Sequence, residues 1–149
     1  MGADLYISQL FDSQFKKWER RFDKAVAYRD RLAEDAPERG EAQKRVEECF
    51  DKMYERGYFR DSYNDSDLLW KFDLSWWDDV VPMLNGKSQL TPEKTAALLG
   101  VLKEREDLFE CNLASQPEPA RRYFRQKYTV FKEFLNQAIQ LGVPIECSL

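Results

Sequence analysis

The feature that most limits the possible folds of this chain is the spacing of its apolar side chains, which recur every three or four residues. That period indicates helices with one apolar face. Such stripes predict helices over about residues 13–34 and 38–56, and Asp35-Ala36-Pro37 separates them because the residue before a proline disfavours helix. We therefore expect an antiparallel helical hairpin. Its core-facing residues would include Phe15, Trp18, Phe22, Ala25, Val26, Ala42, Val46, Cys49, Phe50 and Met53.

The second half of the chain predicts two further helices. Thr91-Pro92-Glu93 has the features of a helix start, with a threonine cap and a proline in the first turn, so a helix is expected from 92 to about 107. Leu108, Phe109 and Leu113 would then lie in a following loop. After the break at 115–119, the apolar stripe predicts a last helix over 118–140.

Both ends of the chain favour strand. Residues 3–10 and 143–149 can pair as a small two-stranded ribbon, provided that helices cover one of its faces. The expected fold class is mainly α: a long helical hairpin, a central irregular helical segment and two further helices, with this ribbon formed from the termini. A chain of 149 residues can bury a sizeable core, so we expect a single globular domain over residues 1–149.

The central segment, residues 57–80, differs from the rest in composition. It holds seven of the 21 aromatic residues and three of the four tryptophans. It also holds six aspartates against one arginine and one lysine, which gives 2 − 6 = −4, the net charge of the whole chain. The remaining residues are therefore neutral in sum. The sequence predicts a neutral helical frame that carries one acidic, aromatic segment.

Turn-forming residues predict a loop over 58–64, and Asp65 or Ser66 can cap a short helix after it. A second short helix would begin at Ser75, with Asp78 three residues later as part of a capping box. Two adjacent tryptophans on a helix cannot both face one core. At least one of Trp76 and Trp77 is therefore expected at the surface.

Several classes of function are disfavoured by composition. The chain has no histidine, which removes Ser–His and Cys–His catalysis and most zinc sites. Its three cysteines are far apart, so we expect reduced, mostly buried thiols and a cytoplasmic protein. The opening residues do not resemble a signal peptide and no apolar run could span a membrane. An acidic balance argues against direct nucleic-acid binding, and we expect no cofactor.

Several groups of residues have the composition of a chemical site, and each also has an ordinary structural interpretation; one, an aromatic stacking surface of Tyr58, Phe59, Tyr63 and the tryptophans, is interpreted mostly as core because it lacks a basic groove. Asp61, Tyr63, Asp65 and Asp67 have the alternation of a calcium loop, but glycine and the final glutamate are missing, so turns and caps are expected instead. Adjacent Asp78 and Asp79 would point about 100° apart on a helix, so they do not form a catalytic pair by themselves. Acidic residues in the first turn also stabilise a helix through its dipole, without any catalytic role. The basic run 121–127 is interpreted as a solvated face or as the counterpart of the acidic segment.

The favoured function is a non-enzymatic, protein-binding role as an inhibitor, immunity-type or adaptor protein. A partly exposed indole among aspartate and arginine is a common composition of interface hot spots. The alternatives are a histidine-free enzyme or small-ligand or metal-binding protein that uses Asp61, Asp65, Asp78 or Asp79 in a Trp-lined pocket, and an acidic mimic of nucleic acid. The partner is expected to be another protein, and a homodimer is an alternative. The predicted contact residues are Arg60, Asp61, Tyr63, Trp76, Trp77, Asp78 and Asp79.

Three segments, MGADLYI, GYFRDSYN and LSWW, resemble small uncharacterised bacterial and phage-associated proteins. The resemblance covers most of the chain and implies a cytoplasmic bacterial setting. It implies no activity, so no functional residue follows from it.

Overall fold

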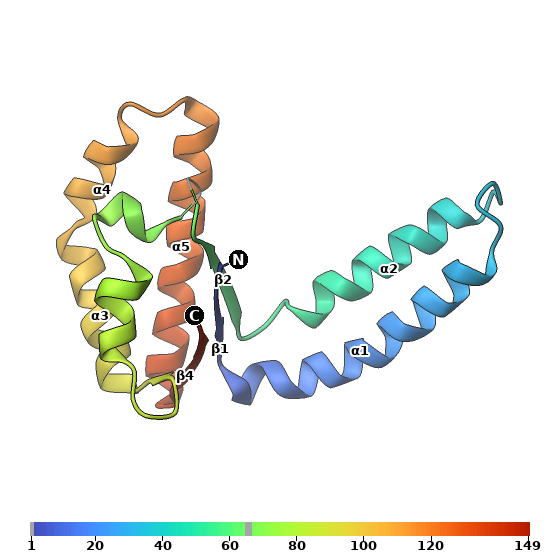
Figure 1. Cartoon of the computed structure of the whole chain (residues 1–149), viewed down its shortest axis with the longest axis horizontal. Helices are drawn as coiled ribbons and strands as arrows, with labels where there is room; N and C mark the ends of the chain where they lie inside the picture. The colour runs from blue at the N-terminus through green and yellow to red at the C-terminus, as the bar shows by residue number, and fades with distance from the viewer. Residues whose placement is uncertain (1, 65–66) are drawn as a thin grey trace. The chain divides into compact units, whose positions relative to one another are not determined.

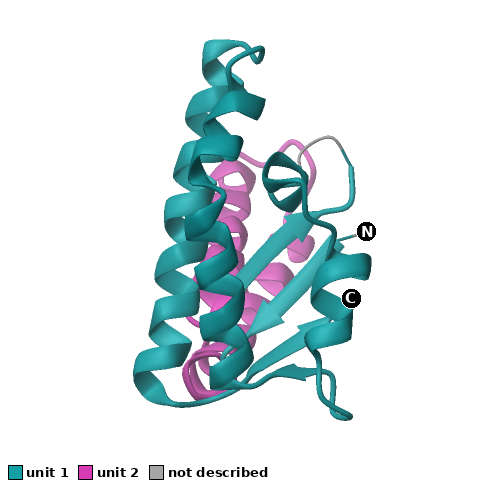
Figure 2. Cartoon of the chain, turned by 90° about the vertical axis from the view of Figure 1, so that its left-hand side faces the viewer, with its two compact units in different colours: residues 1–7, 59–149 teal, residues 8–58 magenta. Residues whose placement is uncertain are grey.

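The computed structural model describes residues 2–64 and 67–149 of the chain (Figure 1). These separate into two compact units: unit 1 comprises residues 1–7 and 59–149, and unit 2 comprises residues 8–58 (Figure 2). The mainly α fold class is confirmed, with the predicted hairpin, central irregular segment and further helices all present. The organisation of residues 1–149 as one domain stays a prediction. No helix of the described residues is long and apolar enough to cross a membrane.

Unit 2 is the predicted hairpin, formed by α1 (Ser8–Arg31) and α2 (Arg39–Met53). Helix α1 begins about five residues earlier than predicted, and this places Phe11 in the same apolar stripe as Phe15, with ring centroids 5.0 Å apart. The Arg39 guanidinium donates to the carbonyls of Arg29 and Leu32 at 3.0 and 2.8 Å. Since the last carbonyls of a helix lack partners within the helix, Arg39 stabilises the C-terminal end of α1.

The core of the hairpin is small. Ala25, Val46 and Cys49 are buried, and Trp18, Phe22 and Val26 pack against them while remaining partly exposed. Tyr28 and Phe50 are about half exposed. The predicted stripe is thus correct in its positions, but several of its rings lie at the edge of the core.

Unit 1 contains a four-stranded sheet in the order β2-β1-β4-β3, formed by β1 (Gly2–Tyr6), β2 (Tyr58–Ser62), β3 (Gln89–Leu90) and β4 (Ile145–Ser148). Strands β1 and β4 are antiparallel, with Leu5 opposite Cys147, so the predicted terminal ribbon is confirmed and forms the centre of a larger sheet. A side chain at Gly2 would collide with the carbonyl oxygen of Asp61, which explains a glycine there.

Three helices complete unit 1: α3 (Pro92–Glu104), α4 (Glu106–Leu113) and α5 (Glu118–Leu141). Thr91 caps α3 as predicted, accepting a hydrogen bond from Lys94 N at 3.3 Å. The prediction of a loop after about 107 was wrong, because α4 continues to Leu113 and buries Phe109 against Phe72, with ring centroids 4.5 Å apart. Gly142 ends α5 with φ +66°, a conformation that suits glycine.

Candidate functional site

The central segment folds as short, irregular helical turns. These are η1 (Leu69–Phe72), the π-helical turn η2 (Trp76–Val80) and η3 (Val81–Met83). Ser75 caps η2 as predicted, since its hydroxyl accepts from Trp77 N and Asp78 N. The acidic partner differs from the prediction: Asp79, rather than Asp78, accepts from Ser75 N, at 2.7 Å. The wider π turn places the fourth residue, instead of the third, near the free N–H.

The loop predicted over 58–64 is wrong for most of its length, because Tyr58–Ser62 is strand β2. Phe59 and Asp61 point inward while Arg60 is exposed, which is ordinary strand alternation. Phe59 stacks on Phe131 of α5 with ring centroids 4.4 Å apart. The strand therefore holds the Asp61 carboxylate inside unit 1.

Asp61 is the centre of a buried hydrogen-bond network. Its carboxylate, fully shielded from solvent, accepts from Leu68 N at 2.9 Å, from Trp76 Nε1 at 2.8 Å and from Lys127 Nζ at 2.7 Å. Ser62 N donates to it at 3.0 Å as well. A buried charge is stable only when it is paired and hydrogen-bonded, and Asp61 meets both conditions. Three elements, β2, η2 and α5, are joined at this one side chain.

Asp67 lies beside this network and is also buried. It shares a side-chain hydrogen bond with Asp61 and accepts from Leu69 N at 2.8 Å. Burial, followed by the bond to Asp61 and its charge, raises the pKa of Asp67 to about 8. Two carboxyl groups can share a hydrogen bond only if one of them carries the proton, so Asp67 is the protonated member at neutral pH.

The Tyr63 hydroxyl is buried and has no hydrogen-bond partner among the described residues. Burial, together with the charges of Asp4, Asp67 and Asp61, raises its pKa. The phenol therefore stays neutral. Its ring lies 5.9 Å from that of Trp77, measured between centroids, and forms part of the surface beside η2.

The structure divides the seven predicted contact residues into two groups. Asp61 and Trp76 are 1% exposed and bonded to each other, so they support the segment from within. Arg60, Trp77, Asp78 and Asp79 are exposed, and Tyr63 is half-buried. The exposed Arg60 guanidinium lies 3.7 Å from the carboxylate of Asp4, which is half-buried. The expectation that one of the adjacent tryptophans reaches the surface is confirmed by Trp77, at 56%.

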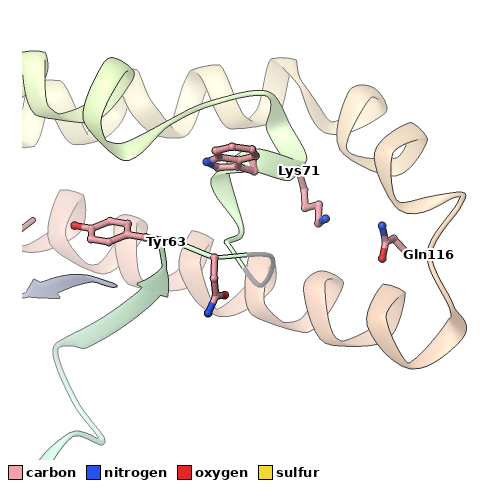
Figure 3. Close-up of a pocket in the computed structure, with 5 residues that line it drawn as sticks. Tyr63, Lys71 and Gln116 are labelled. Atoms are coloured by element: carbon pink, nitrogen blue, oxygen red, sulfur yellow. The ribbon is translucent and has the colours of Figure 1, made fainter. Parts of the chain in front are cut away.

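Sequence reasoning missed Trp70, which is the most exposed of the large hydrophobic residues described, at 68%. It lies in η1, between buried Leu69 and half-buried Lys71. Its position among apolar neighbours suggests a core residue, and only the tight 3₁₀ turn directs it outward. Trp70 lines a pocket of about 370 Å³ together with Tyr63, Asn64, Lys71 and Gln116 (Figure 3).

The other candidate constellations take structural roles. Asp61 and Asp67 of the supposed calcium loop accept backbone N–H groups, and Asp65 lies outside the described residues. Across residues 2–64 and 67–149, no group of three His, Cys, Asp or Glu could hold a metal ion. In the basic run, Arg121 pairs with Glu118 and Arg125 pairs with Glu110. Lys127 pairs with Asp61, so one residue of the run forms an ion pair with the acidic segment.

Substitution of the two adjacent tryptophans should separate their roles. Trp76→Ala removes a buried ring and a hydrogen bond to Asp61 and is expected to destabilise the protein by about 3–5 kcal/mol. Trp77→Ala truncates a mostly exposed ring and should cost less than about 1 kcal/mol. Urea unfolding of both variants measures the difference. Equal losses of stability would contradict this division.

Comparisons of the chain with protein-family models, with curated proteins and with solved structures find no match.

Proposed function

We propose that this chain is a non-enzymatic protein that binds another protein. It would act as an inhibitor, an immunity-type protein or an adaptor. We call the surface that would contact the partner the Trp77 surface, and it comprises Tyr63, Trp70, Trp77, Asp78 and Asp79. Arg60 precedes Tyr63 by three residues and remains a proposed contact residue. The observation that carries the proposal is the exposure of Trp77 directly beside Trp76, which is buried and hydrogen-bonded to Asp61.

A fixed, exposed indole supports protein binding on energetic grounds. Tryptophan is enriched among interface residues whose truncation costs at least about 2 kcal/mol. Binding is weakened by the ordering of mobile groups, and η2 is already held by the Ser75 cap, the Asp79 bond and the Trp76 anchor. The Trp77 surface would therefore lose little conformational freedom when a partner binds.

The charge of this surface indicates what kind of partner fits. Asp73, Asp78 and Asp79 are exposed, whereas Asp61 and Asp67 are buried. A moderately acidic surface favours a partner with basic side chains around an apolar patch and increases the association rate at low salt. Because two of the six aspartates of the segment are internal, the exposed charge is low for a mimic of nucleic acid, which makes that alternative less favourable.

We infer a cytoplasmic setting from the three cysteines, all of which are free, and Cys49 and Cys147 are buried. Secreted proteins of this size often carry disulfides. The bacterial or phage-associated origin rests on the sequence resemblance alone. Homodimer formation is a further proposal, supported by the half-exposed Tyr28 and Phe50 of the hairpin, and analytical ultracentrifugation tests it.

The double variant Trp77→Ala/Asp78→Ala is expected to lose the partner while keeping its fold. An affinity pull-down from the native host lysate, read by mass spectrometry, should give one stoichiometric partner with the wild type. Its affinity for the variant should fall by about 30-fold or more, the equivalent of a hot-spot loss.

The matched control is Tyr28→Ala/Asp23→Ala, which removes an exposed ring and an exposed acid from the hairpin. This control should retain the partner. Unchanged binding by a folded Trp77→Ala/Asp78→Ala variant contradicts the assignment of the surface, and the absence of any partner for the wild type counts against the binding role itself.

A further inference from the structure

The pocket beside η1 is large enough for a small ligand. Its volume of about 370 Å³ lies within the range of pockets that bind small molecules. Its described walls are Tyr63 and Asn64 after β2, two residues of η1, and Gln116 in the turn between α4 and α5. In Figure 3, the side chains of Lys71 and Gln116 extend into the same space, while the Tyr63 hydroxyl points away from both.

Two side chains of this pocket, Lys71 and Gln116, offer N–H donors that no acceptor among the described residues binds. The Lys71 ammonium lies 4.9 Å from the Phe124 ring centroid, and no carboxylate of the described residues pairs with it. The side-chain amide of Gln116 makes no hydrogen bond to the described part of the chain. None of the described residues that line the pocket is acidic. The described lining therefore contributes one positive charge, that of Lys71, although the chain as a whole is negative.

A second pocket, of about 320 Å³ between α4 and α5, shows how different this arrangement is. Its charged residues are paired with one another: Arg125 lies 2.8 Å from Glu110, and Lys132 lies 3.7 Å from Glu106. Tyr128 of the same pocket donates to Glu106 at 2.7 Å. An anion entering that pocket would meet carboxylates and compete with existing ion pairs. Among the described residues that line the η1 pocket, there is no carboxylate to compete in this way.

Trp70 offers a flat, apolar surface at this pocket. Trp70 is 68% exposed and its indole is available for stacking. A planar ring such as a base stacks favourably on an aromatic side chain. A ligand that pairs an anionic group with a flat ring would use both features of the pocket.

We propose that the η1 pocket binds a small organic anion in which a carboxylate or phosphate is attached to a planar ring, with Lys71 and Gln116 binding the anionic oxygens and Trp70 covering the ring. This inference goes beyond the proposed protein-binding role. Neither Trp77 nor Asp78 lines the pocket, so the two activities can be tested separately.

The probes are benzoate and phenyl phosphate, with benzamide as the neutral counterpart of benzoate, each titrated into the full chain and followed by two-dimensional NMR. Benzoate should shift the indole N–H of Trp70 and the side-chain amide of Gln116 in a saturable manner. It should bind at least about tenfold more tightly than benzamide, because hydrogen bonds to charged groups are about twice as strong as neutral ones. Tighter binding of phenyl phosphate than of benzoate would identify phosphate as the preferred group.

Lys71→Gln should weaken benzoate binding by about tenfold, whereas Lys71→Arg keeps the charge and should retain most of it. Lys103→Gln, at an exposed position of α3, is the matched control and should leave it unchanged. Trp77→Ala/Asp78→Ala should also bind benzoate normally, even though it loses the protein partner. Equal binding of benzoate and benzamide, an unaffected Lys71→Gln variant, or no saturable shift with any probe would overturn the proposal.

Discussion

Asp61→Ala is expected to destabilise the protein by about 3–5 kcal/mol, the loss typical of breaking a buried ion pair. The substitution removes the acceptor for Leu68 N and for the indole N–H of Trp76. It also removes the carboxylate that lies 2.7 Å from the Lys127 ammonium, whose side chain is 12% exposed. Since domains are stable by only about 5–15 kcal/mol, much of the native stability would be lost.

Thermal and urea unfolding of Asp61→Ala measure this effect. For a chain of this length, the expected loss corresponds to a fall in Tm of roughly 10–20 °C. Asp78→Ala is the matched control, because it removes an exposed aspartate from the same segment and should change stability by less than about 1 kcal/mol. A loss below about 1 kcal/mol for Asp61→Ala as well would show that the network contributes little.

Lys127→Met tests the same ion pair from the other side. It removes the charge but leaves Asp61 with the N–H donors of Leu68, Ser62 and Trp76. The remaining donors still stabilise the carboxylate, so the destabilisation should be smaller than for Asp61→Ala. The order of the two losses therefore distinguishes a network centred on the carboxylate from one centred on the lysine.

Local chemistry explains why the helical frame could be predicted from the sequence. The caps at Ser75 and Thr91 and the glycine at 142 act within a few residues of themselves, so their effects do not depend on distant contacts. The apolar period of α5 likewise follows from residues that are close in sequence. These features gave the positions of the main helices to within a few residues.

Strand β2 could not be predicted because its pattern contains a buried aspartate. Phe59 and Asp61 both point inward, but an alternation of apolar and polar residues would direct the aspartate outward. The reason that it points inward lies elsewhere in the chain, at Trp76 and Lys127. Distant partners also decide which tryptophan of the pair 76–77 is buried. Because the two residues are adjacent, the sequence predicted that one of them is exposed, but it did not indicate which one.

The other large effect should appear in the pH dependence of stability, through Asp67. The pKa of this carboxyl is raised to about 8 in the folded protein, from an ordinary value of 3.8. Between these values the folded state binds the proton and the unfolded state does not, so the free energy of unfolding falls as pH rises from about 4 to about 8. The slope from this group is at most about 1.4 kcal/mol per pH unit. Above about pH 8 its contribution no longer changes.

Asp67→Asn should remove this slope, because asparagine resembles the protonated acid in shape and can still accept from Leu69 N and donate to Asp61. Urea unfolding of the wild type and of Asp67→Asn at intervals from pH 5 to pH 9 measures the difference between them. The free energy of unfolding of the variant, relative to that of the wild type, should increase with each pH unit. At pH 8–9 the variant should be the more stable protein. Parallel stability curves for the two proteins would mean that Asp67 ionises freely in the folded state.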